Sequence, residues 1–301
     1  SSEISVISKL CLWVSVIIML IFFFVESCVV FGICELSMNL SYFGYGCLLD
    51  CSYCYMKRHT PKGLSVAENT NDILTEINNH AFFATVDKPN QTDPEYVTYD
   101  IACNEDFALH AKYHEWEKIF TFFKEHPIAK ATFATKIIPE VFLKYNPEDK
   151  VRIRFSLMPQ KISSILEPNT SKIEDRLLAV ERFIHAGYDV HLNFSPVVYY
   201  KGWETDYAEL FHLVDQLVTY KDKVKAEVIF LTHNAKKHWS NLENNVPGEK
   251  LLWNPDIQET KTSQYGGDNV RYKRGLKSDL IAQFKDIPGS IIPWNTIRYI
   301  F

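Results

Sequence analysis

Three cysteines in one short segment form the pattern in this chain that is best suited to chemistry. Cys47, Cys51 and Cys54 follow the spacing Cys-x3-Cys-x2-Cys, and no fourth cysteine follows nearby. A closed zinc site or an electron-transfer iron–sulfur cluster takes four protein ligands. Three thiolates on one loop therefore predict a four-iron cluster whose fourth iron is open to a small molecule, which implies chemistry rather than electron storage. A zinc knuckle and a purely structural group of cysteines are the alternatives.

The spacing resembles the motif of the radical S-adenosylmethionine (SAM) superfamily, which is CxxxCxxC with an aromatic residue directly before the last cysteine. Tyr53 occupies that aromatic position beside the cofactor. The resemblance implies a 4Fe–4S cluster held by the three cysteines, with SAM chelated at the open iron. In that superfamily, reductive cleavage of SAM gives a 5'-deoxyadenosyl radical, which takes a hydrogen atom from the substrate.

The composition is that of a globular chain with no general affinity for nucleic acid. Its 301 residues can bury a large core in one domain, and 47% of them are apolar and 23% charged. Because the net charge is −5, any contact with nucleic acid must come from a local basic patch. Seven cysteines in a chain of this length do not suggest a disulfide scaffold. Thiolate-bound iron requires a reducing compartment, so we expect a cytoplasmic location.

A hydrophobic segment precedes the cysteine motif. The sixteen residues 10–25 carry no charge, which is near the lower limit for a membrane span and also fits the core of a signal peptide. Export makes little sense for an iron–sulfur enzyme. Residues 1–36 therefore have three interpretations: a membrane anchor, a stretch that is not authentic coding sequence or is the odd end of a fragment, and a buried core segment.

Strand-like and helix-like segments alternate from the motif to residue 233. This alternation predicts a parallel sheet with right-handed crossovers, and six strands are too few for a complete eight-unit barrel. We expect an α/β fold: a partial (β/α)6 TIM-type barrel of the radical SAM type over residues 37–233, with a C-terminal extension, residues 234–301, that packs on it. The predicted strands are Ser37–Tyr45, Glu95–Ala102, Ala129–Thr135, Val151–Leu157, Asp189–Val198 and Lys225–Leu231, and the predicted helices are Asn69–His80, His110–His126, Pro139–Tyr145, Glu174–Gly187 and Thr205–Tyr220.

Polar or reactive residues stand at the carboxyl ends of these predicted strands. In barrels of parallel strands, chemistry gathers at that edge of the sheet. We therefore expect the following residues to lie at one edge: Cys47, Cys103, Lys136, Ser156, Pro196 and His233.

Four further segments resemble the spore photoproduct lyase family of radical SAM enzymes. They are CSYCYM, EPNTSKIEDRLLAVERFIHAGYDV, SPVVYYKGWETDYAELF and RYKRG, and in this order they extend the resemblance over residues 40–301. That family repairs a thymine dimer in spore DNA. The resemblance implies a monomeric lyase that acts on DNA containing a thymine lesion and receives electrons from a flavodoxin- or ferredoxin-type donor. A radical SAM enzyme that acts on RNA, a peptide or a metabolite is the first alternative, and a zinc- or cluster-containing nucleic-acid-binding protein without catalysis is the second.

The resemblance also implies roles for single residues. Cys103 corresponds to the family's hydrogen-atom donor at the end of the second strand, although a lone cysteine is more commonly buried packing. Lys136 would pair with the SAM carboxylate and Ser156 would hydrogen-bond it, with Asn104 lining the same pocket. Tyr55 would stack on adenine or relay a hydrogen atom; core packing is the alternative.

One dense basic cluster lies near the end of the chain. Arg271, Lys273, Arg274 and Lys277 surround Tyr272 and follow a Gly-Gly turn. We expect the first three to contact phosphates of a nucleic acid, although a solvated surface turn would give the same pattern. Against this interpretation, Cys103 is followed by Asn-Glu-Asp, which is acidic for a pocket that must hold a dinucleotide phosphate.

Overall fold

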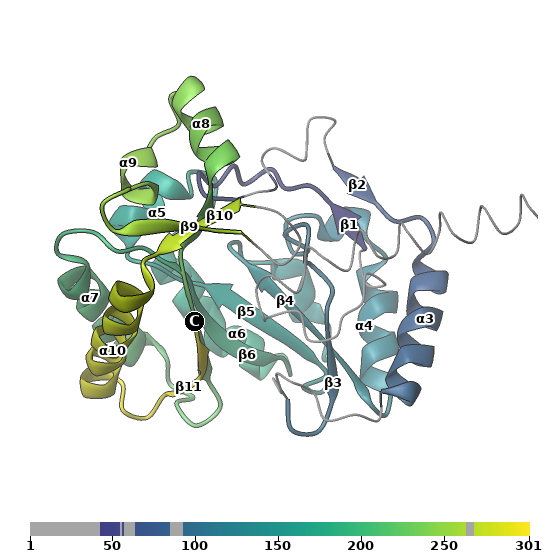
Figure 1. The fold of residues 1–301 in the computed structure, drawn as a ribbon. Helices are drawn as coiled ribbons and strands as arrows, with labels where there is room; N and C mark the ends of the chain where they lie inside the picture. The colour runs from purple at the N-terminus through teal and green to yellow at the C-terminus, as the bar shows by residue number, and fades with distance from the viewer. Residues whose placement is uncertain (1–42, 55, 57–63, 85–92, 263–267) are drawn as a thin grey trace, which may run out of the picture.

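A parallel six-stranded sheet forms the centre of the molecule (Figure 1). The structure is a computed structural model that describes residues 43–54, 56, 64–84, 93–262 and 268–301. The sheet has the strand order β11-β7-β6-β5-β4-β3 and curls into an open half-barrel, as the sequence predicts. Its strands are β3 (Val97–Asp100), β4 (Ala129–Thr135), β5 (Val151–Ser156), β6 (Asp189–Val197), β7 (Lys225–Phe230) and β11 (Thr296–Ile300).

Five predicted strands are confirmed, but the sixth strand of the described sheet comes from the other end of the chain. Of the segment predicted at residues 37–45, the structure describes β1 (Gly44–Tyr45), which pairs antiparallel with β2 (Ser65–Val66) in a separate small sheet. The edge beyond β7 is occupied by β11, which runs parallel to β7. The end of the chain, expected only to pack on the barrel, thus supplies one of its strands.

Helices cover the outer face of the sheet (Figure 1). Aromatic pairs join the two layers: Phe155 of β5 meets Phe183 at 5.6 Å between ring centroids, and Phe194 of β6 meets Phe211 at 5.0 Å. Four of the five predicted helices are confirmed, whereas the segment predicted as one helix at His110–His126 is divided into a short 3-10 helix and an α-helix, because the backbone is extended at His114. Helices α5 and α10 were not predicted. The helices are α3 (Thr70–Phe83), η1 (Ala111–Tyr113), α4 (Trp116–Glu125), η2 (Glu140–Lys144), α5 (Gln160–Leu166), α6 (Ile173–His185), α7 (Trp203–Leu217) and α10 (Arg274–Ile291).

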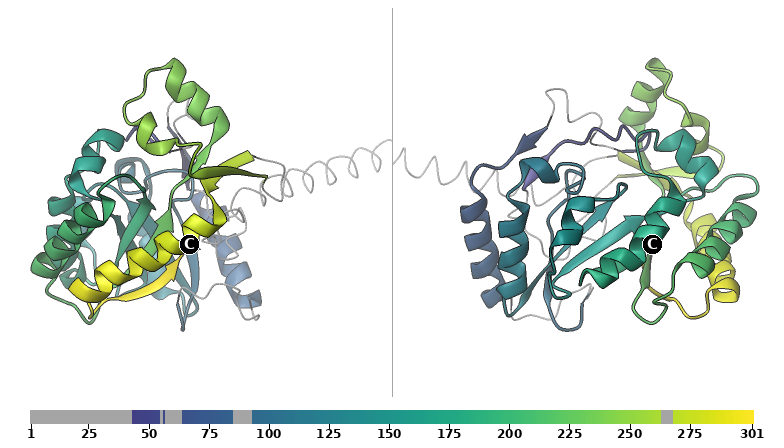
Figure 2. Two further views of the ribbon diagram at one scale, coloured as in Figure 1. Left: turned by 60° about the vertical axis from the view of Figure 1, so that its left-hand side comes forward. Right: turned by 180° about the vertical axis from the view of Figure 1, so that it is seen from behind.

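The chain between β7 and α10 forms a small unit that we call the cap, described over residues 232–262 and 268–272. Its strands β8 (Thr232–Asn234), β10 (Asp268–Tyr272) and β9 (Gln258–Thr262) form an antiparallel sheet in that order. Two helices, α8 (Ala235–Glu243) and α9 (Glu249–Leu252), stand above it (Figure 2). The polar residues and turn signals of this segment did not predict these helices.

The two faces of the central sheet differ in chemistry. Along β5, Phe155 points towards the outer helices, whereas Arg152 and Arg154 alternate with the apolar residues and point the other way. Arg152 donates from Nε to Asp189 at 2.7 Å, and Arg154 donates to Asp100 at 2.5 Å. The inner face of the half-barrel is therefore held by ion pairs between strands.

Strand β11 extends this polar inner face. Arg298 and the Tyr299 hydroxyl both donate to Glu227 of β7, at 2.7 and 2.6 Å. Burial alone would raise the pKa of Glu227, but the hydrogen bond from His191, the charge of Arg154 and the Tyr299 hydrogen bond outweigh it and lower the pKa to about 2.

No helix in the described ranges is both long and apolar enough to cross a membrane. The hydrophobic segment at residues 10–25 lies outside those ranges. Its three interpretations from the sequence therefore stay predictions.

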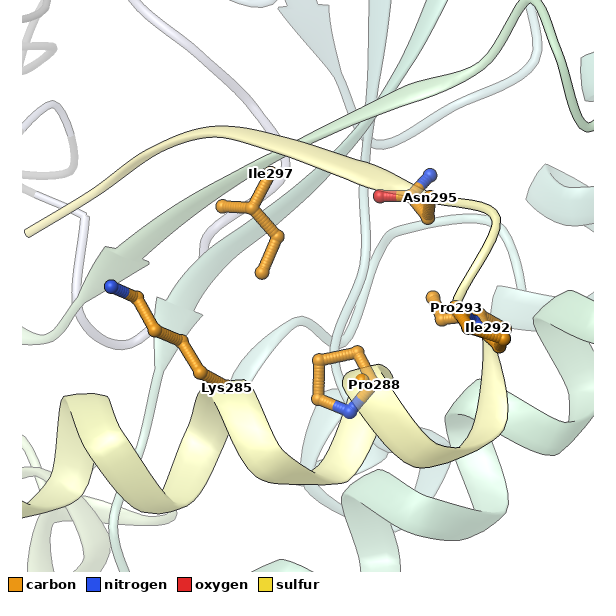
Figure 3. A pocket seen from close by; sticks show the side chains of 7 residues that line it. Lys285, Pro288, Ile292, Pro293, Asn295 and Ile297 are labelled. Atoms are coloured by element: carbon orange, nitrogen blue, oxygen red, sulfur yellow. The ribbon is translucent and has the colours of Figure 1, made fainter.

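A hollow of about 310 Å³ opens between α10 and β11, where Lys285, Pro288 and Ile297 line it (Figure 3). Thr296 at the start of β11 pairs with Lys225 at the start of β7. The hollow thus lies at the amino-terminal edge of the sheet, whereas the sequence places the chemistry at the carboxyl edge.

We expect Glu227→Gln to destabilise the fold at neutral pH and to alter its sensitivity to acid. Folding lowers the pKa of this carboxyl from 4.5 to about 2. Its ionised form thus contributes on the order of 3 kcal/mol of stability above ~pH 4.5, and this is lost as the pH falls through ~2. Urea unfolding followed by tryptophan fluorescence should show a difference between wild type and variant that narrows over this range. A difference independent of pH would contradict the assignment.

Candidate active site at the cysteine loop

The cysteine loop, residues 46–54, lies at the carboxyl edge of the sheet. Gly46 has a φ of 103°, which a residue with a side chain rarely adopts, and it forms a parallel bridge with Glu105 just beyond β3. The Cys54 N–H closes a turn onto the Cys51 carbonyl at 3.0 Å. Cys51 is buried, and the other two motif cysteines are half-buried free thiols.

The three motif thiols fit a metal cluster better than a single ion. Burial raises the pKa of Cys47 to about 12 and that of Cys51 well above its ordinary range, so thiolates here require a positive centre beside them. In the described part of the chain, the sulfur atoms of these three cysteines do not all lie within 4.8 Å of one another. A single zinc ion with Zn–S bonds of about 2.3 Å would need such closeness.

Lys136 and Ser156 lie together beside the loop, as expected. The Lys136 Nζ donates to Ser156 Oγ at 3.3 Å and stands 5.9 Å from the centre of the Tyr53 ring. Burial acts to lower the pKa of Lys136, but the charge of Glu167 outweighs it and raises the pKa. The ammonium group therefore stays charged and can bind a carboxylate.

Glu167 anchors the loop, and the sequence did not single it out. Its Oε1 accepts the Tyr53 hydroxyl from the loop, while Oε2 accepts from Ser163 and from Arg176, each at 3.2 Å. Arg176 is fully buried and also donates to the Ser156 carbonyl at 2.6 Å. Both Glu167 and Arg176 belong to the EPNT…R segment that carries the family resemblance. This segment is the feature of the sequence that could have pointed to them.

Asp106 is a second anchor that the sequence did not single out. Its carboxylate accepts the Thr135 hydroxyl at 2.9 Å and the Lys136 backbone N–H at 2.9 Å, so it ties the turn after β3 to the end of β4. The neighbouring Glu105 is equally internal, because His110 and His114 contact its Oε2 at 3.0 and 2.9 Å. The acidic run after Cys103 is therefore engaged in structure rather than facing a phosphate.

Cys103 lies on the turn that follows β3, beside the cysteine loop. Its half-buried thiol stands 3.8 Å from the Asp100 carbonyl, and the Asp100 carboxylate accepts the Ala102 N–H at 3.0 Å. The next residue, Asn104, accepts the Gly46 N–H on its carbonyl at 2.9 Å. The turn that bears Cys103 is thus tied to the loop that bears the three motif cysteines.

The cap covers the other side of the cysteine loop. Asn241 donates to the Ser52 carbonyl at 3.0 Å, Lys237 donates to the Cys54 carbonyl, and the Ser52 hydroxyl donates to the Pro247 carbonyl at 3.0 Å. These contacts join residues that are 183 to 195 positions apart in the sequence, and no local pattern predicted them.

The basic residues lie on the cap and at the start of α10. Arg271 is half-buried and pairs with Glu259 at 2.9 Å, Lys273 is exposed, and Arg274 begins α10. Burial, together with the charges of Arg271 and Lys261, lowers the pKa of Lys277, so positive charge does concentrate here. Tyr272 points inwards and is buried. Tyr55 lies outside the described residues.

We expect Glu167→Gln to loosen the cysteine loop, because a neutral amide leaves Arg176 buried without its counter-charge. Breaking a buried ion pair in this way costs about 3 kcal/mol. Anaerobic reconstitution should give less iron per chain and a weaker electron paramagnetic resonance signal than wild type. The matched control is Glu140→Gln at an exposed ion pair with Arg182, where a loss below ~1 kcal/mol and full iron content are expected. Equal iron in both variants would rule out the anchoring role.

Comparison with known proteins identifies relatives over most of the chain. The family described as spore photoproduct lyase matches residues 34–301. A curated relative, the spore photoproduct lyase of Bacillus subtilis (strain 168), is 24% identical over 263 residues, which are 85% of this chain and 74% of the relative.

Solved structures agree in fold. A spore photoproduct lyase double mutant with bound AdoMet and dinucleoside spore photoproduct has a TM-score of 0.77 at 21% identity, covering 87% of this chain and 76% of that one. Spore photoproduct lyase complexed with dinucleoside spore photoproduct has a TM-score of 0.75 at 22% identity, covering 86% and 75%. The match over residues 34–301 shows that this chain belongs to the spore photoproduct lyase family.

Proposed function

We propose that this chain is a radical SAM lyase that repairs a thymine lesion of the spore photoproduct kind in DNA. The observation that carries the proposal is the position of Cys103 on a turn bonded directly to the cysteine loop, through the Gly46 N–H and the Asn104 carbonyl. The family match supports the reaction class, and a related lyase has been solved with both AdoMet and dinucleoside spore photoproduct.

A 4Fe–4S cluster and SAM are the cofactors of this family, and the residues present fit them. The three motif thiols are buried or half-buried on one loop and would hold the cluster. Lys136 and Ser156, which already contact each other, would bind the SAM carboxylate, and Tyr53 packs beside them. Together the bound cofactors supply an adenosyl radical that abstracts a hydrogen atom from the substrate.

Cys103 is the hydrogen-atom donor in this proposal. Its S–H bond breaks as a C–H bond forms on the substrate radical, which leaves a thiyl radical on sulfur. Arg154 positions this group, because its ion pair with Asp100 fixes the strand end from which the turn departs. An external donor of the flavodoxin or ferredoxin type would supply the electrons that start the reaction.

The cap and the start of α10 are the proposed DNA contact. Arg271, Lys273 and Arg274 gather positive charge on a chain that is acidic overall, so this patch can attract phosphates locally. The pairing of Arg271 with Glu259 would have to loosen or be shared when a phosphate binds.

We expect Cys103→Ser to separate radical formation from repair. A serine hydroxyl has nearly the same size but a stronger bond to hydrogen, so repair should fall at least ~100-fold, equivalent to about 3 kcal/mol in barrier. The assay is anaerobic incubation with SAM, dithionite and an oligonucleotide carrying the spore photoproduct. Formation of 5'-deoxyadenosine should persist. Unchanged repair would exclude Cys103 as donor, and formation of 5'-deoxyadenosine without repair in the wild type would point to another substrate.

Replacing Arg271, Lys273 and Arg274 together by alanine should weaken DNA binding and reduce its dependence on salt. Each lost phosphate contact removes ~0.7–0.9 from the slope of log affinity against log salt, so a decrease of about 2–3 is expected. Fluorescence anisotropy with a labelled duplex over a range of salt concentrations measures the slope.

A charge-matched control distinguishes a local patch from net charge. Lys112, Lys144 and Lys225 are exposed and lie on other elements, on η1, η2 and the start of β7. Their triple alanine variant has the same net charge but should keep the wild-type slope. Equal slopes for both triple variants would overturn the proposed contact.

A further inference from the structure

We propose that His233, His238 and Glu249 form a binding site for a divalent transition-metal ion of the zinc class, which fixes the cap over the cysteine loop. This site is separate from the three motif cysteines. It joins strand β8, helix α8 and helix α9, which follow one another along the chain.

The three side chains are close enough to share one metal ion, which would replace the hydrogen bonds that now join them. One ligand atom from each residue lies within 4.8 Å of the others. The His233 Nε2 is 2.9 Å from Glu249 Oε1, and the His238 Nδ1 is 2.6 Å from the same oxygen. The side chains are 0%, 8% and 7% exposed in the order His233, His238 and Glu249.

The ligand types suit zinc. Two imidazoles and one carboxylate are a donor set that zinc binds in proteins, with a water or another group in the fourth position. The soft thiolates that would favour a cluster are absent from these three residues. Asn241 stands at the carboxylate, since its Nδ2 donates to Glu249 Oε2 at 2.5 Å, and so it orients the ligand as outer-shell partners do.

In this buried group, the protein partners compensate the negative charge of Glu249 only in part. Glu249 carries its charge in a buried position, and its described partners are the two histidines and Asn241. The His233 ring is fully buried, and its Nδ1 has no hydrogen-bond partner in the described part of the chain. A cation between the imidazoles and the carboxylate would neutralise the charge that burial otherwise disfavours.

The packing around the site holds the ligands in place. The Trp253 ring stacks on His238 at 4.0 Å between centroids, with an interplanar angle of 14°, and lies edge-on to His233 at 6.2 Å. Such rigid support keeps imidazole nitrogens aimed at a common point.

The chain offers an internal comparison. Glu105 is also contacted by two histidines, His110 and His114, at hydrogen-bond distance. Within the described ranges, however, the metal-like spacing is met by the cap residues and not by this second group. The proposal thus depends on the mutual spacing of all three ligand atoms, and not only on a carboxylate that contacts two histidines.

A metal ion at this site would restrain the position of the cysteine loop. Asn241 bonds Glu249 with the same Nδ2 that donates to the Ser52 carbonyl, and Ser52 directly follows Cys51. An ion bound at Glu249 would therefore restrain the loop that carries the thiols, through one intervening side chain.

The test uses the full chain with its cysteine loop loaded with iron, so that zinc cannot occupy the thiols. Mass spectrometry of metals after dialysis against micromolar zinc should find about one zinc per chain. His238→Gln and Glu249→Gln, which keep similar volume, should bind zinc at least ~100-fold more weakly, whereas the control Glu105→Gln should bind it as wild type does. With cobalt in place of zinc, the difference spectrum against the iron-loaded chain without cobalt should show visible cobalt bands and no added thiolate-to-cobalt charge transfer.

Three results would overturn the proposal. The first is iron-loaded wild type that retains no zinc. The second is zinc retained equally by His238→Gln and Glu249→Gln. The third is a cobalt difference spectrum, taken against the iron-loaded chain, with thiolate-to-cobalt charge transfer, which would place the ion at the cysteines. Because the readout is metal content and not repair, failure here leaves the proposed reaction untouched, and loss of repair in Cys103→Ser leaves this site untouched.

Discussion

The buried carboxylate of Glu167 is the interaction on which the arrangement of the site depends. The cysteine loop has no regular secondary structure that could fix three thiols, so its neighbours must do so. Glu167 accepts the Tyr53 hydroxyl from the loop and pairs with Arg176 from α6. Its charge also keeps Lys136 protonated beside the loop. One side chain thus couples the position of the thiols to the charge available for binding a carboxylate.

Ion pairs on the inner face of the half-barrel fix the relative positions of the strand ends, although the barrel is not closed. A complete barrel fills its interior with apolar layers, whereas here the strands are joined across their inner face by pairs such as Arg154 with Asp100 and Arg298 with Glu227. Such pairs are directional, so they fix the relative height of the strands as well as their contact. The same network reaches Cys103, because Asp100 begins the turn that carries it.

The sequence predicted those parts that depend on local periodicity or on a chemical motif. Strand β5 and helix α6 have strong patterns, and both are confirmed within two residues. Strand β11 was missed, because it joins the sheet through pairing with a strand some seventy residues earlier, which periodicity cannot reveal. The strand predicted at residues 37–45 lies mostly outside the described residues, so its place in the barrel stays a prediction. The role of Asp106 also depends on a contact between distant segments: near Cys103 its charge only counts against a phosphate-binding pocket, whereas in the fold it bonds backbone and side chain at the end of β4.

The cap contacts the cysteine loop, although its sequence pattern predicts an irregular segment. Its sequence is polar and rich in turn signals, yet it folds into two helices, and side chains of α8 reach the backbone of the cysteine loop at Ser52 and Cys54. Such a segment buries few apolar residues and gains little from the hydrophobic effect, so its stability must come from polar contacts. The group of His233, His238 and Glu249 lies where those contacts converge. A metal ion at that point would give the cap the rigidity that its small core does not provide.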